Sequence, residues 1–343
     1  MNREPILTVK NLKISFHTKA GMLQAIRGID FDLERGKTLA IVGESGSGKS
    51  VTVRAIMGIR SKNEDAGGSI LYRCRQDDGS VKEYDIIEMK KKDVISQLCG
   101  KHIAMVFQDP MTTLDPTMTI GKQVMEGMRL HLHITKDEAW KRAVALLDEV
   151  GITSPETRMK QYPHQLSGGM RQRVVIAIAL SCEPDILICD EPTTALDVTI
   201  QAKILELIAR IQREREISVI YITHDLGVVA KVADSVAVMY AGHIVEQGTA
   251  REIFYEPRHP YTWGLLDSVP DISKDTERLY SIPGNPPNLL SQVKGDAFAP
   301  RNQYALAIDY EEEPPRFQIS DTHYVYSWLE DPRAPKISRA AGK

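Results

Sequence analysis

The sequence predicts an α/β fold built around a parallel sheet, and two observations support this prediction. Short apolar segments alternate along the chain with stretches of helical periodicity, which is typical of parallel strands joined by helical crossovers. A glycine-rich loop at 43–50 lies between an expected strand at 38–42 and an expected helix at about 49–59. A strand that feeds a helix through such a loop is the basic unit of an α/β core.

The segments before the glycine-rich loop predict strands of a different kind. Residues 7–16 and 23–33 alternate apolar and polar side chains, and residues 73–84 contain the turn signal Asp77-Asp-Gly79. We expect an antiparallel β-subdomain here. Further strands are expected at 101–107, 186–189 and 218–223, a helix at 198–215, and a hairpin formed by 236–240 and 243–247.

The remaining chain divides into a helical insertion and a tail. Between 119 and 165 apolar residues recur every three or four positions, as in Trp140, Ala143 and Leu147, so we expect a helical subdomain at about 110–165. Beyond residue 260 the chain is rich in proline and lacks strong periodicity. We therefore expect a main domain at 1–260 and an irregular extension at 261–343.

Composition indicates a globular protein with a sizeable core. The chain has 343 residues, of which 42% are hydrophobic and 26% charged, and its net charge of −3 gives no reason to expect a nucleic-acid partner. No apolar run is long enough to span a membrane, and the N-terminus lacks the apolar segment of a secretory signal. We predict a cytoplasmic protein that could dock on a membrane partner. The four cysteines have no Cys-x-x-Cys spacing, so we expect neither disulfides nor a metal site at them.

The glycine-rich loop predicts nucleotide binding. Gly43, Gly48, Lys49 and Ser50 fit G-x-x-x-x-G-K-[ST], in which backbone N–H groups surround phosphates, the lysine meets the β- and γ-phosphates and the hydroxyl ligates Mg²⁺. We expect ATP or GTP with Mg²⁺ as the ligand of a P-loop NTPase. The residues expected to contact it are Gly43, Glu44, Ser45, Gly46, Ser47, Gly48, Lys49, Ser50 and Val51.

Two acids end the expected strand at 186–189. Asp190 follows this strand, where a P-loop NTPase places the carboxylate that assists Mg²⁺, and Glu191 is the candidate general base for water. The alternative is that both acids cap the N-terminus of a helix. Their position after a phosphate loop favours the catalytic interpretation.

Two further polar side chains follow expected strands. Gln108 could ligate Mg²⁺ through its amide oxygen or accept a hydrogen bond from water, and its alternative is a surface amide. His224 could contact the γ-phosphate and orient Glu191, whereas a single histidine at this place is more often structural.

Taken in order, these residues resemble the motifs of ABC transporter ATPases. The set consists of Lys49 (Walker A), Gln108 (Q-loop), Leu166-Ser-Gly-Gly-Met170 (signature), Asp190-Glu191 (Walker B), Ala195-Leu-Asp197 (D-loop) and His224 (switch histidine). The resemblance covers about residues 7–260. It implies an ABC ATPase core with the β- and α-helical subdomains described above.

The resemblance also implies a head-to-tail dimer that encloses two ATP molecules. Ser167, Gly168 and Gly169 would contact the γ-phosphate bound by the partner, and Asp197 would couple the two sites. Phe16 lies where the family stacks an aromatic ring on adenine, although a strand core position is an equal interpretation. The helical subdomain would meet membrane subunits.

Other segments are similar to the oligopeptide and dipeptide importer ATPases. They are Gln108–Pro116, Tyr162–Ser167, His259–Thr262 and Pro283–Leu289. Many members of this group have four tail cysteines thought to hold an iron–sulfur cluster. Here the apparent positions hold Asp296, Asn302, Asp309 and Ser327. Because none of them supplies a thiolate, we expect no iron–sulfur cluster, with the tail packing through residues such as Phe298, Tyr304 and Trp328.

The resemblance implies an ATP-hydrolysing subunit of a bacterial peptide importer at the cytoplasmic face of the cell membrane. Its partners would be a second, related ABC ATPase, two transmembrane permeases and, through the complex, an extracytoplasmic substrate-binding protein, with no nucleic acid. Three alternatives stay open: an importer for nickel or another solute, a non-transport ABC ATPase acting on nucleic acid or ribosomes, and a nucleotide switch without turnover. The intact Gln108, Glu191 and His224 argue against the switch.

Overall fold

The computed structural model describes residues 4–76, 78–193, 197–269 and 281–337. Two sheets form the framework, with strand orders β2-β1-β4-β5 and β11-β12-β10-β9-β3-β8-β7-β6. The strands are β1 (Pro5–Thr18), β2 (Gly21–Glu34), β3 (Thr38–Val42), β4 (Glu64–Arg75), β5 (Val81–Asp85), β6 (Ile103–Val106), β7 (Ile186–Asp190), β8 (Ser218–Thr223), β9 (Ser235–Tyr240), β10 (His243–Thr249), β11 (Arg316–Gln318) and β12 (Tyr324–Tyr326).

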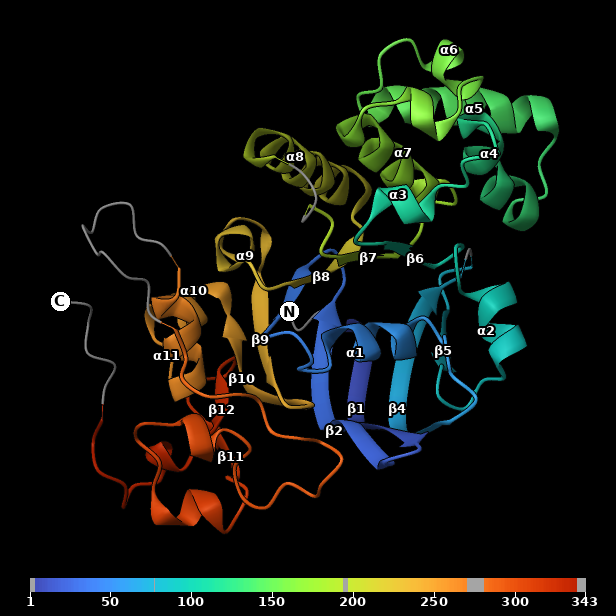
Figure 1. Ribbon diagram of the computed structural model, residues 1–343. Coiled ribbons are helices and arrows are strands. Elements are labelled where there is room, and N and C mark those ends of the chain that lie inside the picture. The colour runs from blue at the N-terminus through green and yellow to red at the C-terminus, as the bar shows by residue number, and fades with distance from the viewer. Residues whose placement is uncertain (1–3, 77, 194–196, 270–280, 338–343) are drawn as a thin grey trace.

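The helices cluster beside the second sheet and above it in Figure 1, and only α1 and α2 lie beside the antiparallel sheet. They are α1 (Lys49–Ile56), α2 (Lys91–Gln97), α3 (Pro110–Thr113), α4 (Ile120–His131), α5 (Lys136–Glu149), α6 (Pro155–Met159), α7 (Gly168–Leu180), α8 (Val198–Arg215), α9 (Leu226–Val232), α10 (Ala250–Tyr255) and α11 (Pro260–Asp267). Turns of 3₁₀ helix occur at Pro163–Gln165, Ala299–Arg301, Ala307–Tyr310 and Trp328–Glu330.

The second sheet contains the predicted parallel core. β9, β3, β8, β7 and β6 are parallel neighbours, whereas β10 pairs antiparallel with β9. The predicted antiparallel β-subdomain is the first sheet, in which β1 pairs with both β2 and β4. The predicted α/β fold with a parallel core and an antiparallel β-subdomain is thus confirmed. Because parallel strands end at the same edge of a sheet, the segments that follow β3, β6, β7 and β8 meet at one edge.

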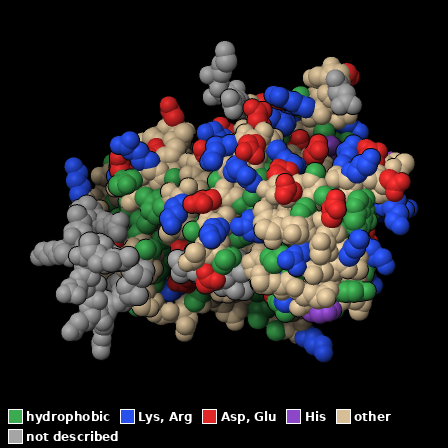
Figure 2. Space-filling view, turned by 90° about the horizontal axis from the view of Figure 1, so that it is seen from above, with side chains coloured by type: hydrophobic (Ala, Val, Ile, Leu, Met, Phe, Trp, Pro, Cys, Tyr) green, Lys and Arg blue, Asp and Glu red, His purple; other side chains and the backbone are tan. Residues whose placement is uncertain are grey.

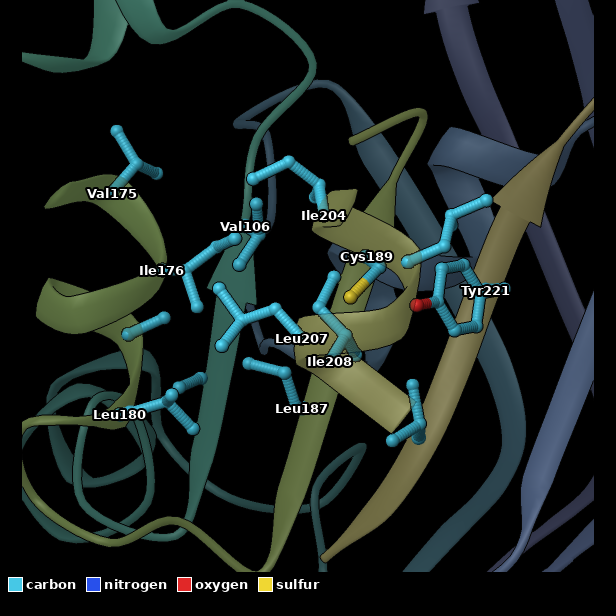
Figure 3. Packing of buried hydrophobic residues seen from close by; sticks show 14 of the residues in the cluster. Val106, Val175, Ile176, Leu180, Leu187, Cys189, Ile204, Leu207, Ile208 and Tyr221 are labelled. Carbon is cyan, nitrogen blue, oxygen red and sulfur yellow. The ribbon is translucent and has the colours of Figure 1, made fainter. Parts of the chain in front are cut away.

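The central strands are buried on both faces, which explains their uninterrupted apolar sequences. Successive side chains of β3 alternate between two cores: Leu39 and Ile41 join the core shared with the β-subdomain, while Ala40 and Val42 join the opposite core. Figure 3 shows part of this second core, where side chains of β6, β7 and β8 meet those of α7 and α8. The labelled members are Val106, Val175, Ile176, Leu180, Leu187, Cys189, Ile204, Leu207, Ile208 and Tyr221.

The helical group seen in the structure continues past residue 165, while the subdomain limits of about 110–165 stay a prediction. Figure 1 shows α3 to α7 as one cluster, so that α7, which begins at Gly168, is part of it. The reason is that α7 is apolar from Val174 onward: it contacts α4, α5 and β6, and its residues Val174, Ile176 and Ala177 are fully buried.

The tail is less irregular than the sequence predicts. β12 pairs with β10, and β11 pairs with β12, so that the extension adds two strands to the edge of the main sheet. These strands have only three residues each, too few for a periodic signal. In addition, Tyr261 of α11 and Phe298 lie in the same core as the parallel strands. The division after residue 260 stays a prediction. None of the helices in the described ranges has the length and apolar character needed to span a bilayer.

Candidate nucleotide-binding site

A cleft of about 860 Å³ opens at the carboxyl edge of the parallel strands. Residues from seven separate segments of the chain line it, and most of the predicted site residues are among them. The lining residues are Phe16, Leu23, Ala25, Ser45, Gly46, Gly48, Lys49, Ser50, Val51, Gln108, Asp190, Glu191, His224 and Leu289. Topology explains this convergence because Gln108, Asp190 and His224 each end or follow a neighbouring parallel strand.

The phosphate loop connects β3 to α1 at one end of this cleft. Gly43 adopts a φ of 153°, and a Cβ atom there would lie 2.1 Å from the Met239 carbonyl oxygen, so only glycine fits. Lys49 donates hydrogen bonds from Nζ to the carbonyl oxygens of Gly43 (2.7 Å) and Glu44 (2.9 Å). The loop therefore curls around its own ammonium group, beside the N-terminus of α1.

Charges in the cleft shift one another's pKa values. Burial lowers the pKa of Lys49, although the negative charges of Glu191, Asp190 and Glu44 oppose this effect. Burial and the neighbouring Glu191 raise the pKa of Asp190, against the attraction of Lys49. Two carboxylates beside one lysine hold more negative charge than the lysine neutralises. A divalent cation would relieve this repulsion.

Glu191 accepts hydrogen bonds from two predicted site residues, of which only His224 is predicted as its partner. Gln108 Nε2 donates to Glu191 Oε2 over 2.9 Å, and His224 Nδ1 lies 2.9 Å from Glu191 Oε1. The backbone of Glu191 is in the left-handed region, with a φ of 44°, which is uncommon for a residue with a side chain. The carboxylate is thus fixed from two sides at the mouth of the phosphate loop.

The donor set fits Mg²⁺. The hydroxyl of Ser50, the amide oxygen of Gln108 and the carboxylate of Asp190 line the same cleft as Lys49. All three are hard oxygen ligands, which Mg²⁺ prefers, and the ion keeps other positions for water and phosphate oxygens. The thiol of Cys189, one residue away, is fully buried in the core.

Part of the cleft lining is apolar. Phe16, Leu23 and Ala25 of the antiparallel sheet line it together with Leu289 of the tail. The Leu289 carbonyl oxygen accepts the Gln24 N–H over 3.1 Å, which fastens the tail segment to β2. Sequence reasoning placed Phe16 here but missed Leu289. The segment Pro283–Leu289 was noticed only as a motif, and nothing in its pattern indicates where it lies.

Comparisons with known proteins show the family of this chain. Residues 26–194 match the family described as ABC transporter, and residues 245–308 match the oligopeptide/dipeptide transporter C-terminal region. The chain belongs to the ABC transporter family.

Its similar relatives include two bacterial proteins aligned over almost the whole chain. The dipeptide transport ATP-binding protein DppD of Lactococcus lactis is 56% identical over 98% of this chain and 95% of its own length. The oligopeptide transport ATP-binding protein OppD of Bacillus subtilis is 57% identical over 97% and 91%.

Solved ABC cassettes share the fold of the core. The cbiO1 protein of Clostridium perfringens, part of an ABC transporter complex, has a TM-score of 0.60 and 32% identity over 74% of this chain and 92% of its own. The dimeric bacterial ABC transporter cassette MJ0796 has a TM-score of 0.60 and 25% identity over 71% and 99%.

The ABC signature lies apart from the cleft. Ser167 caps the N-terminus of α7 by accepting the Met170 N–H, and neither it nor Gly168 or Gly169 lines the cleft. Ser167 and Gly168 are exposed, and a Cβ atom at Gly168 would have no neighbour within 4 Å. The signature therefore forms an exposed surface that is separate from the cleft.

The D-loop is described only in part. Asp197 caps α8 by accepting the Ile200 N–H over 3.0 Å, while Ala195 and Leu196 lie outside the described residues.

Three predicted residues of the phosphate loop, Glu44, Gly43 and Ser47, do not line the cleft. The Glu44 carboxylate instead pairs with Arg301 of the tail, a contact that the sequence did not indicate.

In the tail, the residues at the apparent cysteine positions form local hydrogen bonds. Asp296, Asn302, Asp309 and Ser327 each accept a backbone N–H from a residue two or three positions away. The donors are Phe298, Tyr304, Leu306 and Leu329, respectively. Burial raises the pKa of Asp296 to about 7. These side chains close turns of the tail, which also packs through Phe298 against Tyr240 and Tyr261.

All four cysteines are free thiols. At the other end of the parallel strands, Cys74 lies within 4.8 Å of ligand atoms of His102 and Asp185, a grouping of a kind that can hold a metal. Asp185 is already bound by His102 Nδ1 (2.8 Å) and by the Tyr72 hydroxyl (2.5 Å). These hydrogen bonds account for the cluster, and we assign it a structural role.

Proposed function

We propose that this chain is the ATP-hydrolysing, energy-coupling subunit of a bacterial importer for oligopeptides or dipeptides. The observation that carries this proposal is the pairing of one complete catalytic cleft with an exposed signature on the same chain. The relatives named for oligopeptide and dipeptide transport match over nearly the full chain, tail included, which supports peptides as the solute class.

In the proposed cycle, each residue keeps a defined task. Lys49 and the backbone of the phosphate loop bind the phosphates, and Ser50, Gln108 and Asp190 would hold Mg²⁺, which would offset charge on the phosphate oxygens. Glu191 accepts a proton from water, and His224 orients that carboxylate. Phe16 and Leu289 line the place for the adenine ring.

We propose a head-to-tail arrangement with a second ABC ATPase. Ser167, Gly168 and Gly169 then contact the partner's γ-phosphate through hydroxyl and backbone N–H groups at the N-terminus of α7, and Asp197 couples the two sites. The dimeric cassette with the same core fold supports this geometry. ATP binding closes the dimer and hydrolysis reopens it, which moves two permease subunits on the cytoplasmic face of the membrane.

Nucleic acid is not among the proposed partners. On the face shown in Figure 2, Lys and Arg side chains are interspersed with Asp and Glu and do not gather into a basic patch. The tail is proposed to hold no iron–sulfur cluster because residues 261–343 contain no cysteine. Iron and acid-labile sulfide in the purified protein would contradict this.

Peptide uptake tests the proposal. In a strain without the gene, the native chain should restore uptake of labelled di- and oligopeptides, whereas Glu191→Gln should bind ATP but lower uptake and hydrolysis by about 10²-fold or more. Glu214→Gln, an exposed glutamate of α8 outside the cleft, is the matched control. Normal peptide uptake without the gene, or full activity of Glu191→Gln in the assembled complex, would refute the proposal.

A further inference from the structure

A residue of the tail, Arg301, contacts the phosphate loop. Glu44, the second residue of the loop, accepts two hydrogen bonds from Arg301, with distances of 2.7 Å from Nη1 to Oε2 and 3.0 Å from Nη2 to Oε1. This is the two-pronged geometry in which guanidinium and carboxylate bind most strongly. The contact joins residues that are 257 positions apart in the chain.

Arg301 is itself held firmly. Its Nε donates to the Pro283 carbonyl oxygen over 2.8 Å, and its Nη1 lies 3.3 Å from the Tyr240 hydroxyl. Only 5% of its side chain is exposed, compared with 28% for Glu44. Burial alone would lower the pKa of Arg301, but the hydrogen bonds to Glu44 and Tyr240 raise it. The guanidinium is thus a fixed positive charge behind the loop.

A second residue from the same region holds the backbone of Glu44. The Glu44 N–H donates to the Tyr261 hydroxyl over 2.8 Å. Tyr261 is fully buried, with its ring 4.7 Å from Tyr240 and 5.3 Å from Phe298. Both the side chain and the main chain of Glu44 are therefore fixed by α11 and the tail.

The charge of Glu44 links its contact with Arg301 to nucleotide binding. Lys49, which lines the cleft, donates a hydrogen bond from Nζ to the Glu44 carbonyl oxygen over 2.9 Å, and the Glu44 carboxylate acts on its charge. Without Arg301 the negative charge of Glu44 would be unpaired beside the loop and would oppose the negative charge of a bound triphosphate. We propose that Arg301 is a positioning residue of the nucleotide site, which fixes and neutralises Glu44 so that the phosphate loop accepts ATP.

This inference rests on nucleotide binding at the cleft, and the test uses the full chain. We would measure Kd for a non-hydrolysable MgATP analogue, for MgADP and for adenosine. For Arg301→Met we expect MgATP analogue binding to weaken on the order of tenfold, MgADP to weaken less, and adenosine, which is uncharged, to be unaffected. A merely structural role would weaken all three ligands alike.

Three further variants make the comparison specific. Arg301→Lys keeps the charge and should lose less affinity than Arg301→Met. In the double variant Glu44→Gln/Arg301→Met the repelling carboxylate is gone, so most of the lost affinity should return. Arg333→Met removes an arginine of the same tail whose side chain is 84% exposed and pairs with Asp331, and it should bind all three ligands as the native chain does.

The outcomes separate the inference from the proposed function. If the native chain binds none of these nucleotides, the proposed function fails. If it binds them and Arg301→Met binds equally well, or the double variant is no better than Arg301→Met, the inference alone is overturned. If Arg301→Met does not fold, Glu44→Gln tests the same ion pair through its partner in the phosphate loop. That variant should bind the MgATP analogue at least as tightly as the native chain, and a weakening of about tenfold would overturn the inference.

Discussion

Glu191 shows how much one residue depends on its surroundings. Its side chain is 16% exposed and receives hydrogen bonds from Gln108 and His224, which follow two other strands of the sheet. Its left-handed backbone, with a φ of 44°, is a conformation that proteins tend to retain at functional sites because other contacts hold it in place. The identity of the residue is visible in the sequence, whereas this conformation is not.

His259 is a residue whose protonation should affect stability. It is fully buried at the start of α11, where its Nδ1 accepts the Tyr261 N–H over 3.0 Å. Burial, assisted by the charge of His243, lowers its pKa to about 3. Below the pKa of an unfolded histidine, about 6.5, the unfolded chain binds a proton that the folded chain does not, so stability falls as pH falls.

We therefore predict a pH-dependent stability difference between the native chain and His259→Asn, which keeps an acceptor for the cap. Between about pH 7.5 and about pH 5.5 the native chain should lose about 1.4 kcal/mol more unfolding free energy than the variant. Urea unfolding at both pH values measures this. If the difference in unfolding free energy between the native chain and His259→Asn is the same at both pH values, His259 accepts a proton in the folded state.

At the scale of elements, the sequence predicted what local pattern determines. The strands β3, β7 and β8 and the helix α8 are where we expected them because each carries an uninterrupted signal, apolar on both faces or periodic over 18 residues. The pairing of β12 with β10 could not be predicted, since two three-residue segments gain their stability only from distant partners. Leu289 and Arg301 were missed for the same reason.

The tail segment that carries Leu289 should contribute to nucleotide affinity. Truncating its side chain removes apolar surface from the proposed adenine end of the cleft, so Leu289→Ser should weaken ATP binding about fivefold, equivalent to about 1 kcal/mol. Because the proposed contact is with the base, binding of ADP and adenosine should weaken to a similar degree, unlike in the Arg301 variants. Leu290→Ser is the matched control, as that neighbour does not line the cleft. If Leu289→Ser and Leu290→Ser bind ATP with equal affinity, Leu289 does not contribute to the nucleotide site.

At the scale of the whole molecule, the proposed head-to-tail arrangement gives each chain one half of each of two sites. The cleft contains Lys49 and Glu191, whereas Ser167 and Gly168 lie on the separate helical group of Figure 1. The sequence could predict this division through family resemblance alone, because no local pattern indicates that a Ser-Gly-Gly turn serves another subunit. The measurable consequence is that a variant of the signature should leave folding and nucleotide affinity of the isolated chain intact.

Gly168→Asp tests that consequence. A Cβ atom at Gly168 has no neighbour within 4 Å, and Gly168 is not among the residues with positive φ, so the backbone accepts a side chain. An aspartate in the first turn of α7 should stabilise the helix slightly, by about 0.3–1 kcal/mol, because it faces the positive end of the dipole. In an assembled complex the same charge would face the γ-phosphate held by the partner, so we expect ATP hydrolysis to fall by about 10²-fold or more.

The measurements are thermal unfolding and nucleotide affinity of the isolated chain, and ATPase activity of the membrane complex. Gly168→Ala, which adds volume without charge, is the control and should retain more activity than Gly168→Asp. Loss of nucleotide affinity in the isolated Gly168→Asp chain would mean that the signature acts within its own subunit. Full ATPase activity of a complex carrying Gly168→Asp would mean that this surface meets no nucleotide. Either result would contradict the head-to-tail arrangement, since that arrangement requires the variant to fold, to bind ATP and to fail only when two subunits close around it.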